Sequence, residues 1–99
     1  MHIQPIPQNW TITYDPYADF LQVYDQRLHK MSGSNLKKEH SRYYTLFFDK
    51  KNKDFLMLQV ENVFDKFKKD ITDMSRDEII SLLFSLEKNG TEKGNQNRK

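Results

Sequence analysis

The sequence predicts a small single-domain α+β fold. Three observations lead to this prediction: an alternating run near the start, two aromatic-rich strand patterns in the middle, and a capped amphipathic helix near the end. A chain of 99 residues has the length of one domain. We expect an extended arm over residues 1–8, a folded domain over 9–90, and a disordered polar tail over 91–99, which has no apolar side chain.

The first expected element is a strand over residues 9–14, NWTITY. Its large apolar side chains, Trp10, Ile12 and Tyr14, alternate with threonines. A period of two in residues that favour strands is typical of an extended chain. We therefore expect a short N-terminal strand.

The next stretch, DPYADFLQVYDQRLHKMSG, fits either an amphipathic helix or a β-hairpin that turns at Asp15-Pro16. Asp15 suits the N-cap, Pro16 suits the first helical position, and Gly33 suits the residue that ends a helix. We predict a helix at 16–31 and keep the hairpin as the alternative. Helical spacing joins the large apolar side chains into one stripe, which consists of Tyr17, Phe20, Leu21, Tyr24, Leu28 and Met31.

The centre of the chain predicts a β-hairpin. Residues 32–40 form a polar stretch, which we expect to be a linker. Residues 41–49 and 54–62 are rich in aromatic and large aliphatic side chains, and a short polar turn, KKNK, separates them. The apolar spacing of residues 63–71 fits both a helical turn and a strand, and we favour the helical turn.

A second long helix is predicted at 76–88. Ser75 and Glu78 have the spacing of a capping box, in which each side chain bonds the backbone N–H of the other residue. A broad apolar face follows, and Asn89-Gly90 is expected to end the helix.

The central hairpin carries large apolar side chains on both of its faces, whichever register it adopts. Burying one Phe or Leu contributes roughly 1.5–3 kcal/mol, so each face needs a cover. If the two long helices pack on opposite faces, no free surface remains. If both pack on one face, the other face can bind a protein partner or a second copy of the chain through Tyr43, Phe47, Phe55 and Met57.

The inventory of reactive residues argues against an enzyme. The chain has no Cys, which excludes disulfides and thiolate chemistry. Its histidines, His2, His29 and His40, match no metal-ligand or triad spacing, and its glycines form no phosphate-binding loop. We therefore expect no catalytic residue, no metal, no cofactor and no small-molecule substrate.

Nucleic-acid binding is the alternative function. The net charge of +2 gives no long-range attraction to nucleic acid, but short runs of basic residues adjoin the aromatic strands. Such residues hold phosphates while exposed aromatic rings stack on unpaired bases. The candidates are Arg42, Lys50, Lys51, Lys53, Lys66 and Lys69.

No feature of the sequence indicates export or membrane insertion. The first residues lack the basic start and apolar run of a secretory signal, and no stretch approaches the roughly 18 apolar residues of a membrane span. We expect a cytoplasmic protein without membrane contact.

Two resemblances concern only small parts of the pattern. The segment YDPYADFLQVYD resembles the opening of small uncharacterised bacterial proteins that begin with a Tyr-Asp-Pro-x-Ala-Asp hairpin. The predicted order of helix, hairpin, short element and helix is similar to that of the small signal recognition particle subunits that bind Alu RNA. A few residues and an element order imply neither a function nor a site.

The expected function is therefore non-enzymatic binding of another macromolecule. A protein partner or a second copy, met through the aromatic face of the hairpin, is the first choice. A small regulator or inhibitor would fit the size of the chain. An RNA- or DNA-binding subunit is the alternative.

Overall fold

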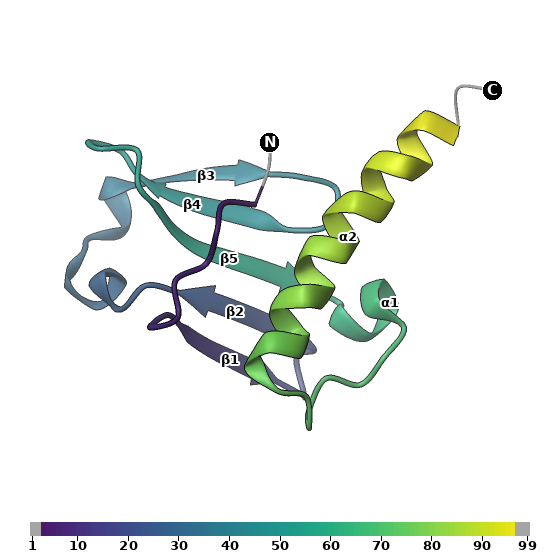
Figure 1. Cartoon of the computed structure of the whole chain (residues 1–99). Helices are drawn as coiled ribbons and strands as arrows, with labels where there is room; N and C mark the ends of the chain where they lie inside the picture. Colours follow the sequence, from purple (N-terminus) through teal and green to yellow (C-terminus); the bar gives the residue numbers. More distant parts are fainter. Residues whose placement is uncertain (1–2, 97–99) are drawn as a thin grey trace.

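A five-stranded antiparallel sheet with helices packed against it confirms the predicted small α+β fold (Figure 1). The computed structural model describes the backbone of residues 3–96 and the side chains of residues 3–86. The strand order is β1-β2-β5-β4-β3. The strands are β1 (Thr11–Asp15), β2 (Phe20–Tyr24), β3 (Leu36–His40), β4 (Thr45–Asp49) and β5 (Phe55–Glu61). The helices are α1 (Val63–Phe67), α2 (Arg76–Gln96) and two short 3-10 helices, η1 (Gln26–Lys30) and η2 (Gly33–Asn35).

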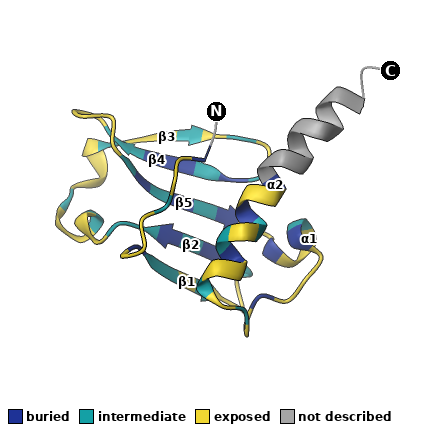
Figure 2. Cartoon of the chain, in the orientation of Figure 1, coloured by how far each residue is buried: buried dark blue, intermediate teal, exposed yellow. Residues whose placement is uncertain are grey.

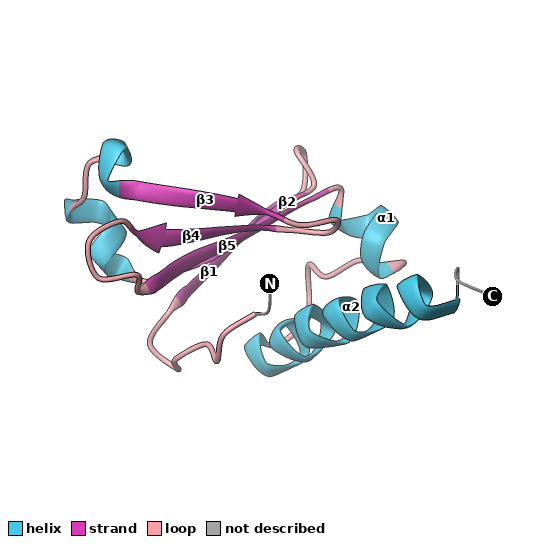
Figure 3. Ribbon diagram, turned by 90° about the horizontal axis from the view of Figure 1, so that it is seen from above, coloured by secondary structure: helices cyan, strands magenta, loops and turns pink. Residues whose placement is uncertain are grey.

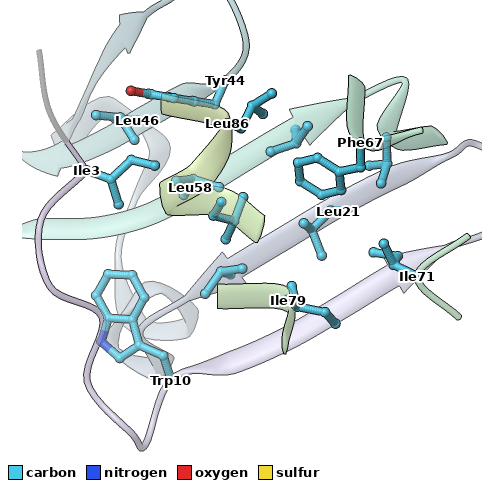
Figure 4. Packing of buried hydrophobic residues seen from close by; sticks show 14 residues of the cluster. Ile3, Trp10, Leu21, Tyr44, Leu46, Leu58, Phe67, Ile71, Ile79 and Leu86 are labelled. Atoms are coloured by element: carbon cyan, nitrogen blue, oxygen red, sulfur yellow. The ribbon is translucent and has the colours of Figure 1, made fainter. Parts of the chain in front are cut away.

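The main core lies on one side of the sheet. Helix α2 and the N-terminal segment cover this face, and α1 lies beside α2 at the end of β5 (Figures 1 and 3). Burial alternates along the strands (Figure 2), and the buried side chains point into the space between the sheet and the segments that cover it (Figure 4), as the pleat of a strand requires. Members of this core include Leu21, Val23, Leu46, Leu58 and Val60 from the strands and Ile79, Leu83 and Leu86 from α2.

The predicted helix at 16–31 is wrong. The segment contains the β1–β2 turn, strand β2 and η1. Burial in β2 alternates, because Leu21 and Val23 are fully buried while their neighbours are only partly buried. The alternative, a hairpin that turns at Asp15-Pro16, is the structure that forms.

Pairing with β5 explains why the hairpin replaces the helix. Strand β2 has β1 on one side and β5 on the other, so its backbone groups can be hydrogen-bonded along both edges. Leu21 faces Val60, Val23 faces Leu58, and all four side chains are fully buried. A helix over the same residues would leave β5 without one of its two neighbours.

Asp15 acts as a cap, but in a turn. Its Oδ1 atom accepts hydrogen bonds from the backbone N–H groups of Tyr17 at 2.9 Å and of Ala18 at 3.2 Å. A helix N-terminus and an Asp-initiated turn both bond the carboxylate to N–H groups two or three residues further on. The Asp-Pro signal therefore marks where a turn begins without deciding whether a helix follows.

Asp19 ties the β1–β2 turn to α1. Its backbone is left-handed, with φ 55°, a conformation that Asp tolerates better than most residues. Its carboxylate accepts a hydrogen bond from the Tyr14 hydroxyl at 2.7 Å and another from the Phe64 N–H at 3.1 Å. The Val63 N–H also donates to the Asp19 carbonyl at 3.2 Å. The turn thus supplies acceptors for the first N–H groups of α1.

The expected linker over 32–40 is also wrong in part, because its second half forms strand β3. This strand pairs with β4, with Lys38 opposite Phe47 and His40 opposite Thr45. β3 lies at the sheet edge and has one strand neighbour. Charged side chains on an edge strand are a common protection against unwanted strand pairing. Because β3 is mostly polar, it has no apolar alternation from which a strand could be predicted.

The central hairpin, the helical turn and the start of the last helix are confirmed. The Ser75 N–H donates to Glu78 Oε1 at 3.0 Å, and the Glu78 N–H donates to Ser75 Oγ at 3.2 Å. Both bonds of the predicted capping box are therefore present. Hydrogen bonds from the backbone and side chain of Ser75 to the Glu78 carboxylate lower the pKa of Glu78, because they favour its ionised form.

The N-terminal segment contributes to the core although no regular element forms there. Ile3 and Trp10 are buried, and the Arg76 guanidinium at the start of α2 donates to the Trp10 carbonyl at 2.9 Å. Residues 3–10 are therefore fastened to α2, and the first two residues, including His2, lie outside the described residues.

Helix α2 extends to Gln96, beyond its expected end at Asn89-Gly90. The predicted disordered tail over 91–99 falls on residues whose side chains, and from residue 97 also whose backbone, lie outside the described part. It stays a prediction. None of the helices within the described residues has the length and apolar character needed to cross a membrane.

Substitution of Asp19 tests its role as a tie between the turn and α1. Asp19→Ala removes the carboxylate acceptor and places alanine in the left-handed region, so we expect a loss of about 2–3 kcal/mol in unfolding free energy. Asp19→Asn keeps an acceptor oxygen and tolerates the backbone, so it should lose only about 1 kcal/mol. Urea denaturation measures both, and equal losses would contradict this role.

The Tyr14 hydroxyl should make stability depend on pH in alkaline solution. Its hydrogen bond to Asp19, together with burial and nearby carboxylates, raises the pKa of Tyr14 from 10.0 to about 12. Since the folded-state pKa lies above the unfolded value, the contribution to stability is complete below about pH 10 and is lost as the pH rises through about 12.

Tyrosinate absorbance and the unfolding free energy, measured across this pH range, provide the check. Tyr14→Phe should remove one tyrosine that ionises near pH 12 and reduce the fall in stability above about pH 10. If the substitution removes a tyrosine that ionises near pH 10 instead, the hydrogen bond does not hold the proton as described.

Candidate functional site

The candidate site is the face of the sheet opposite α2, called the open face here (Figure 3). Neither α2 nor the N-terminal segment lies on it. Because side chains alternate along a strand, the neighbours of the core residues point to this face. They are Phe20, Gln22 and Tyr24 on β2, Met57 and Gln59 on β5, and Thr45 and Phe47 on β4.

The chain itself shields one end of the open face. His29, in η1, meets the Tyr24 ring edge-on with the ring centroids 5.6 Å apart. The Lys38 ammonium lies 5.6 Å from the centre of the Phe47 ring. Phe47 is only 6% exposed and Leu56 1% exposed, although neither belongs to the main core cluster. Phe47, a predicted binding residue, is therefore mostly covered within the chain.

A register shift in the hairpin separates the predicted partner-binding residues. It falls between Phe47 and Phe48, where β5 has one more residue than β4. Phe55 therefore pairs with Phe48 on the helix side, and its ring lies 5.0 Å from the Trp10 ring. Met57 pairs with Phe47 on the open face. Of the predicted set, Phe47 and Met57 share the open face and Phe55 does not.

Tyr43 and the predicted basic residues lie in separate places. Tyr43 is in the β3–β4 loop, packs partly against the core, and has the Arg42 guanidinium 5.8 Å from its ring centre. Arg42 and Lys66 line one depression of about 280 Å³ at that end of the sheet. The remaining candidates are Lys50, Lys51 and Lys53 in the β4–β5 turn, at the other end of β4, and Lys69 after α1.

The accessible centre of the open face is uncharged. Its half-buried side chains mix amide, hydroxyl, thioether and aromatic groups. Charged side chains lie towards its borders, with Lys38 on the edge strand β3 and Glu61 at the end of β5. The uncharged centre consists of Gln22, Thr45, Met57 and Gln59, and Phe20 lies at the end of β2, opposite Glu61.

Two strongly exposed aromatic residues lie at one end of the sheet. Tyr17, at the tip of the β1–β2 turn, is 99% exposed, and Phe64, in α1, is 57% exposed. The Asp19 carboxylate joins the turn to the Phe64 N–H, so both side chains lie at the end of the sheet where Phe20 lies. The sequence assigned Tyr17 to a helical stripe, and only the hairpin moves it to a turn tip.

The described residues contain no group of three or more His, Cys, Asp or Glu side chains placed to hold a metal ion. Comparison of the chain with protein-family models, with curated proteins and with solved structures found no match. The assignment of a role to the open face rests on the geometry and chemistry of this chain.

Two substitutions of phenylalanine by alanine should distinguish a ring that is buried within the chain from a ring that is exposed to solvent. Phe47→Ala removes a buried ring and should cost about 3–5 kcal/mol in unfolding free energy. Phe64→Ala removes a mostly exposed ring and should change stability by no more than about 0.5 kcal/mol. Chemical denaturation gives both values, and a small cost for Phe47→Ala would mean that its ring is not covered in solution.

Proposed function

We propose that this protein binds another protein through the open face, extended by Tyr17 and Phe64. The observation that carries the proposal is the one-sided cover of the sheet by α2 and the N-terminal segment (Figure 3). The opposite face keeps aromatic and thioether side chains at its accessible surface. Monomeric proteins rarely expose contiguous apolar patches unless a partner covers them.

The composition of the open face supports a protein partner. Interface centres are depleted in charged residues and enriched in aromatic residues and Met. The open face has Met57 beside uncharged amide and hydroxyl groups at its centre and Phe20 at one end, and its charges lie at the border. A complementary partner surface is therefore flat and uncharged at its centre, with polar groups that can bond Gln22 and Gln59.

The area of the sheet indicates that Tyr17 and Phe64 belong to the interface. Strands about 4.8 Å apart and about 17 Å long give five strands a flat area of roughly 350 Å². Stable interfaces bury about 800 Å² on each partner. The exposed rings at the β1–β2 turn and on α1 extend the face in the direction where apolar surface is available.

Protein binding is preferred to nucleic-acid binding because of where the cations lie. Arg42 and Lys66 sit at one end of β4, and the three turn lysines sit at the other. Binding of a nucleic-acid backbone draws on cations that follow its phosphates in a groove. The uncharged centre of the open face separates the two groups.

A photocrosslinking amino acid on the open face tests the proposal. The crosslinker replaces Gln59, and the control replaces Ser81, which is exposed on α2. In cells, the Gln59 position should form a discrete crosslinked product that the Ser81 position does not form. The purified partner should then bind Met57→Lys at least about tenfold more weakly than the wild type, equivalent to about 1.4 kcal/mol.

Ser81→Lys, with the same added charge on the helix side, should bind that partner as the wild type does. Light scattering that reveals a dimer, lost in Met57→Lys, would identify the partner as a second copy. Equal crosslinking at both positions, or normal binding by folded Met57→Lys, would exclude the open face. A gel-shift series over salt concentration covers the nucleic-acid alternative, whose affinity should fall steeply with ionic strength.

A further inference from the structure

The two edge strands of the sheet differ in how strongly their side chains oppose pairing with an added strand. Both β1 and β3 have one strand neighbour, so each keeps a row of backbone groups that no strand pairs. β3 has the sequence LKKEH, with charged side chains that oppose the addition of another strand. β1 has the sequence TITYD, with no charge before its last residue. β1 is therefore the edge at which an added strand meets least resistance.

An apolar groove of about 510 Å³ runs beside β1, on the helix side of the sheet, and is called the edge groove here. One wall consists of alternate residues of β1 and the residue before it, and the other belongs to α2 and the segment that leads into it. Its apolar lining is Trp10, Ile12, Tyr14, Ile71, Met74 and Ile79.

The strand and the groove have the geometry of a peptide site. A strand that pairs with β1 continues the pleat, so every second side chain of that strand points to the helix side. Those side chains enter the edge groove, while the peptide backbone bonds the free edge of β1. This arrangement, main-chain pairing for affinity and pockets at alternate positions for specificity, is a known mode of peptide recognition.

The ends of the edge groove carry opposite charges. At the Trp10 end, the Arg76 guanidinium is held by the Trp10 carbonyl at 2.9 Å. At the Tyr14 end, the Tyr14 hydroxyl donates to Asp19 at 2.7 Å. Asp15 and Asp70 lie close enough for their carboxylates to raise the pKa of Tyr14 as well. The groove therefore has the Arg76 guanidinium in its wall at one end and the Asp19 carboxylate bonded to its Tyr14 wall at the other.

We propose that the edge groove binds an extended peptide segment of a partner protein, added to β1 as a sixth strand. The segment has apolar side chains at alternate positions and a Lys or Arg at the end next to Asp19 and Asp70. Charge complementarity selects this occupant, because a basic residue there meets Asp19, which bonds the Tyr14 hydroxyl, and Asp70, which directly precedes Ile71 in the groove wall. The site is distinct from the open face, which lies on the other side of the sheet.

Selection of random heptapeptides by phage display against the full-length protein tests the proposal. The enriched sequences should alternate apolar and polar residues and end in Lys or Arg on one side. Synthetic peptides of these sequences should bind Met74→Lys, with a charge in the groove wall, at least about tenfold more weakly. Asp70→Asn, which keeps a hydrogen-bond acceptor, should weaken basic peptides about two- to fivefold, and the exposed control Asp73→Asn should not.

Backbone methylation of the peptide separates strand addition from simple insertion into the groove, with no risk to the folding of the protein. An N-methyl group at every second residue should abolish binding in one phase of the alternation and leave it unchanged in the other, because only alternate N–H groups face β1. Equal effects in both phases would overturn strand addition.

Three further results would overturn the proposal: no enriched sequence, unchanged binding to folded Met74→Lys, or a dimer in light scattering that forms through β1. Met57→Lys, on the open face, should bind the peptides as the wild type does. Failure of the peptide site is therefore distinguishable from failure of the open face.

Discussion

The pairing of β2 with β5 is the interaction on which the rest of the structure depends. It joins two parts of the chain that are far apart in sequence, and it places the buried pairs Leu21–Val60 and Val23–Leu58 at the centre of the core. The β1–β2 hairpin and the β3–β4–β5 meander become one sheet only through this contact. Once they are joined, α2 can cover a single continuous face.

One-sided cover follows from the size of the chain. A domain of 99 residues has one long helix to place against the sheet, and that helix covers the face where the β2–β5 pairs lie. The opposite face is shielded in part by η1 and by Lys38, which lies over Phe47. In the described part of the chain, two surfaces are therefore left without a covering element: the open face, which has no second layer, and the outer edge of β1, which has no strand neighbour.

These two surfaces are chemically different. The open face offers a flat, uncharged centre with exposed rings at one end, and it suits a folded partner. The edge groove offers backbone groups beside a cavity of about 510 Å³ with apolar side chains in its walls, which is the shape proposed to take an extended segment. Asp19 lies at the end of the sheet that these surfaces share, because its carboxylate bonds Tyr14 in the edge groove and the N–H of Phe64 at the start of α1.

The sequence by itself determined the elements whose signals are local. The central hairpin follows from two apolar strands around a polar turn, and the start of α2 follows from the Ser75–Glu78 capping box. The α+β class and the presence of apolar groups on both faces of the hairpin follow from the same patterns. Met57 lies on the face expected to be free, although its role there remains a proposal.

The tertiary structure decided what the local signals left open. Tyr17, Phe20 and Leu21 suit a helical stripe as well as a hairpin, and only β5, distant in sequence, selects the hairpin. The one-residue register shift beside Phe48 turned Phe55 away from the open face, because side chains reverse sides when pairing moves by one residue. Strand β3 has no apolar pattern of its own, and the edge groove brings the alternating residues of β1 against residues 71–79, which are distant in sequence, so both exist only in the packed tertiary structure.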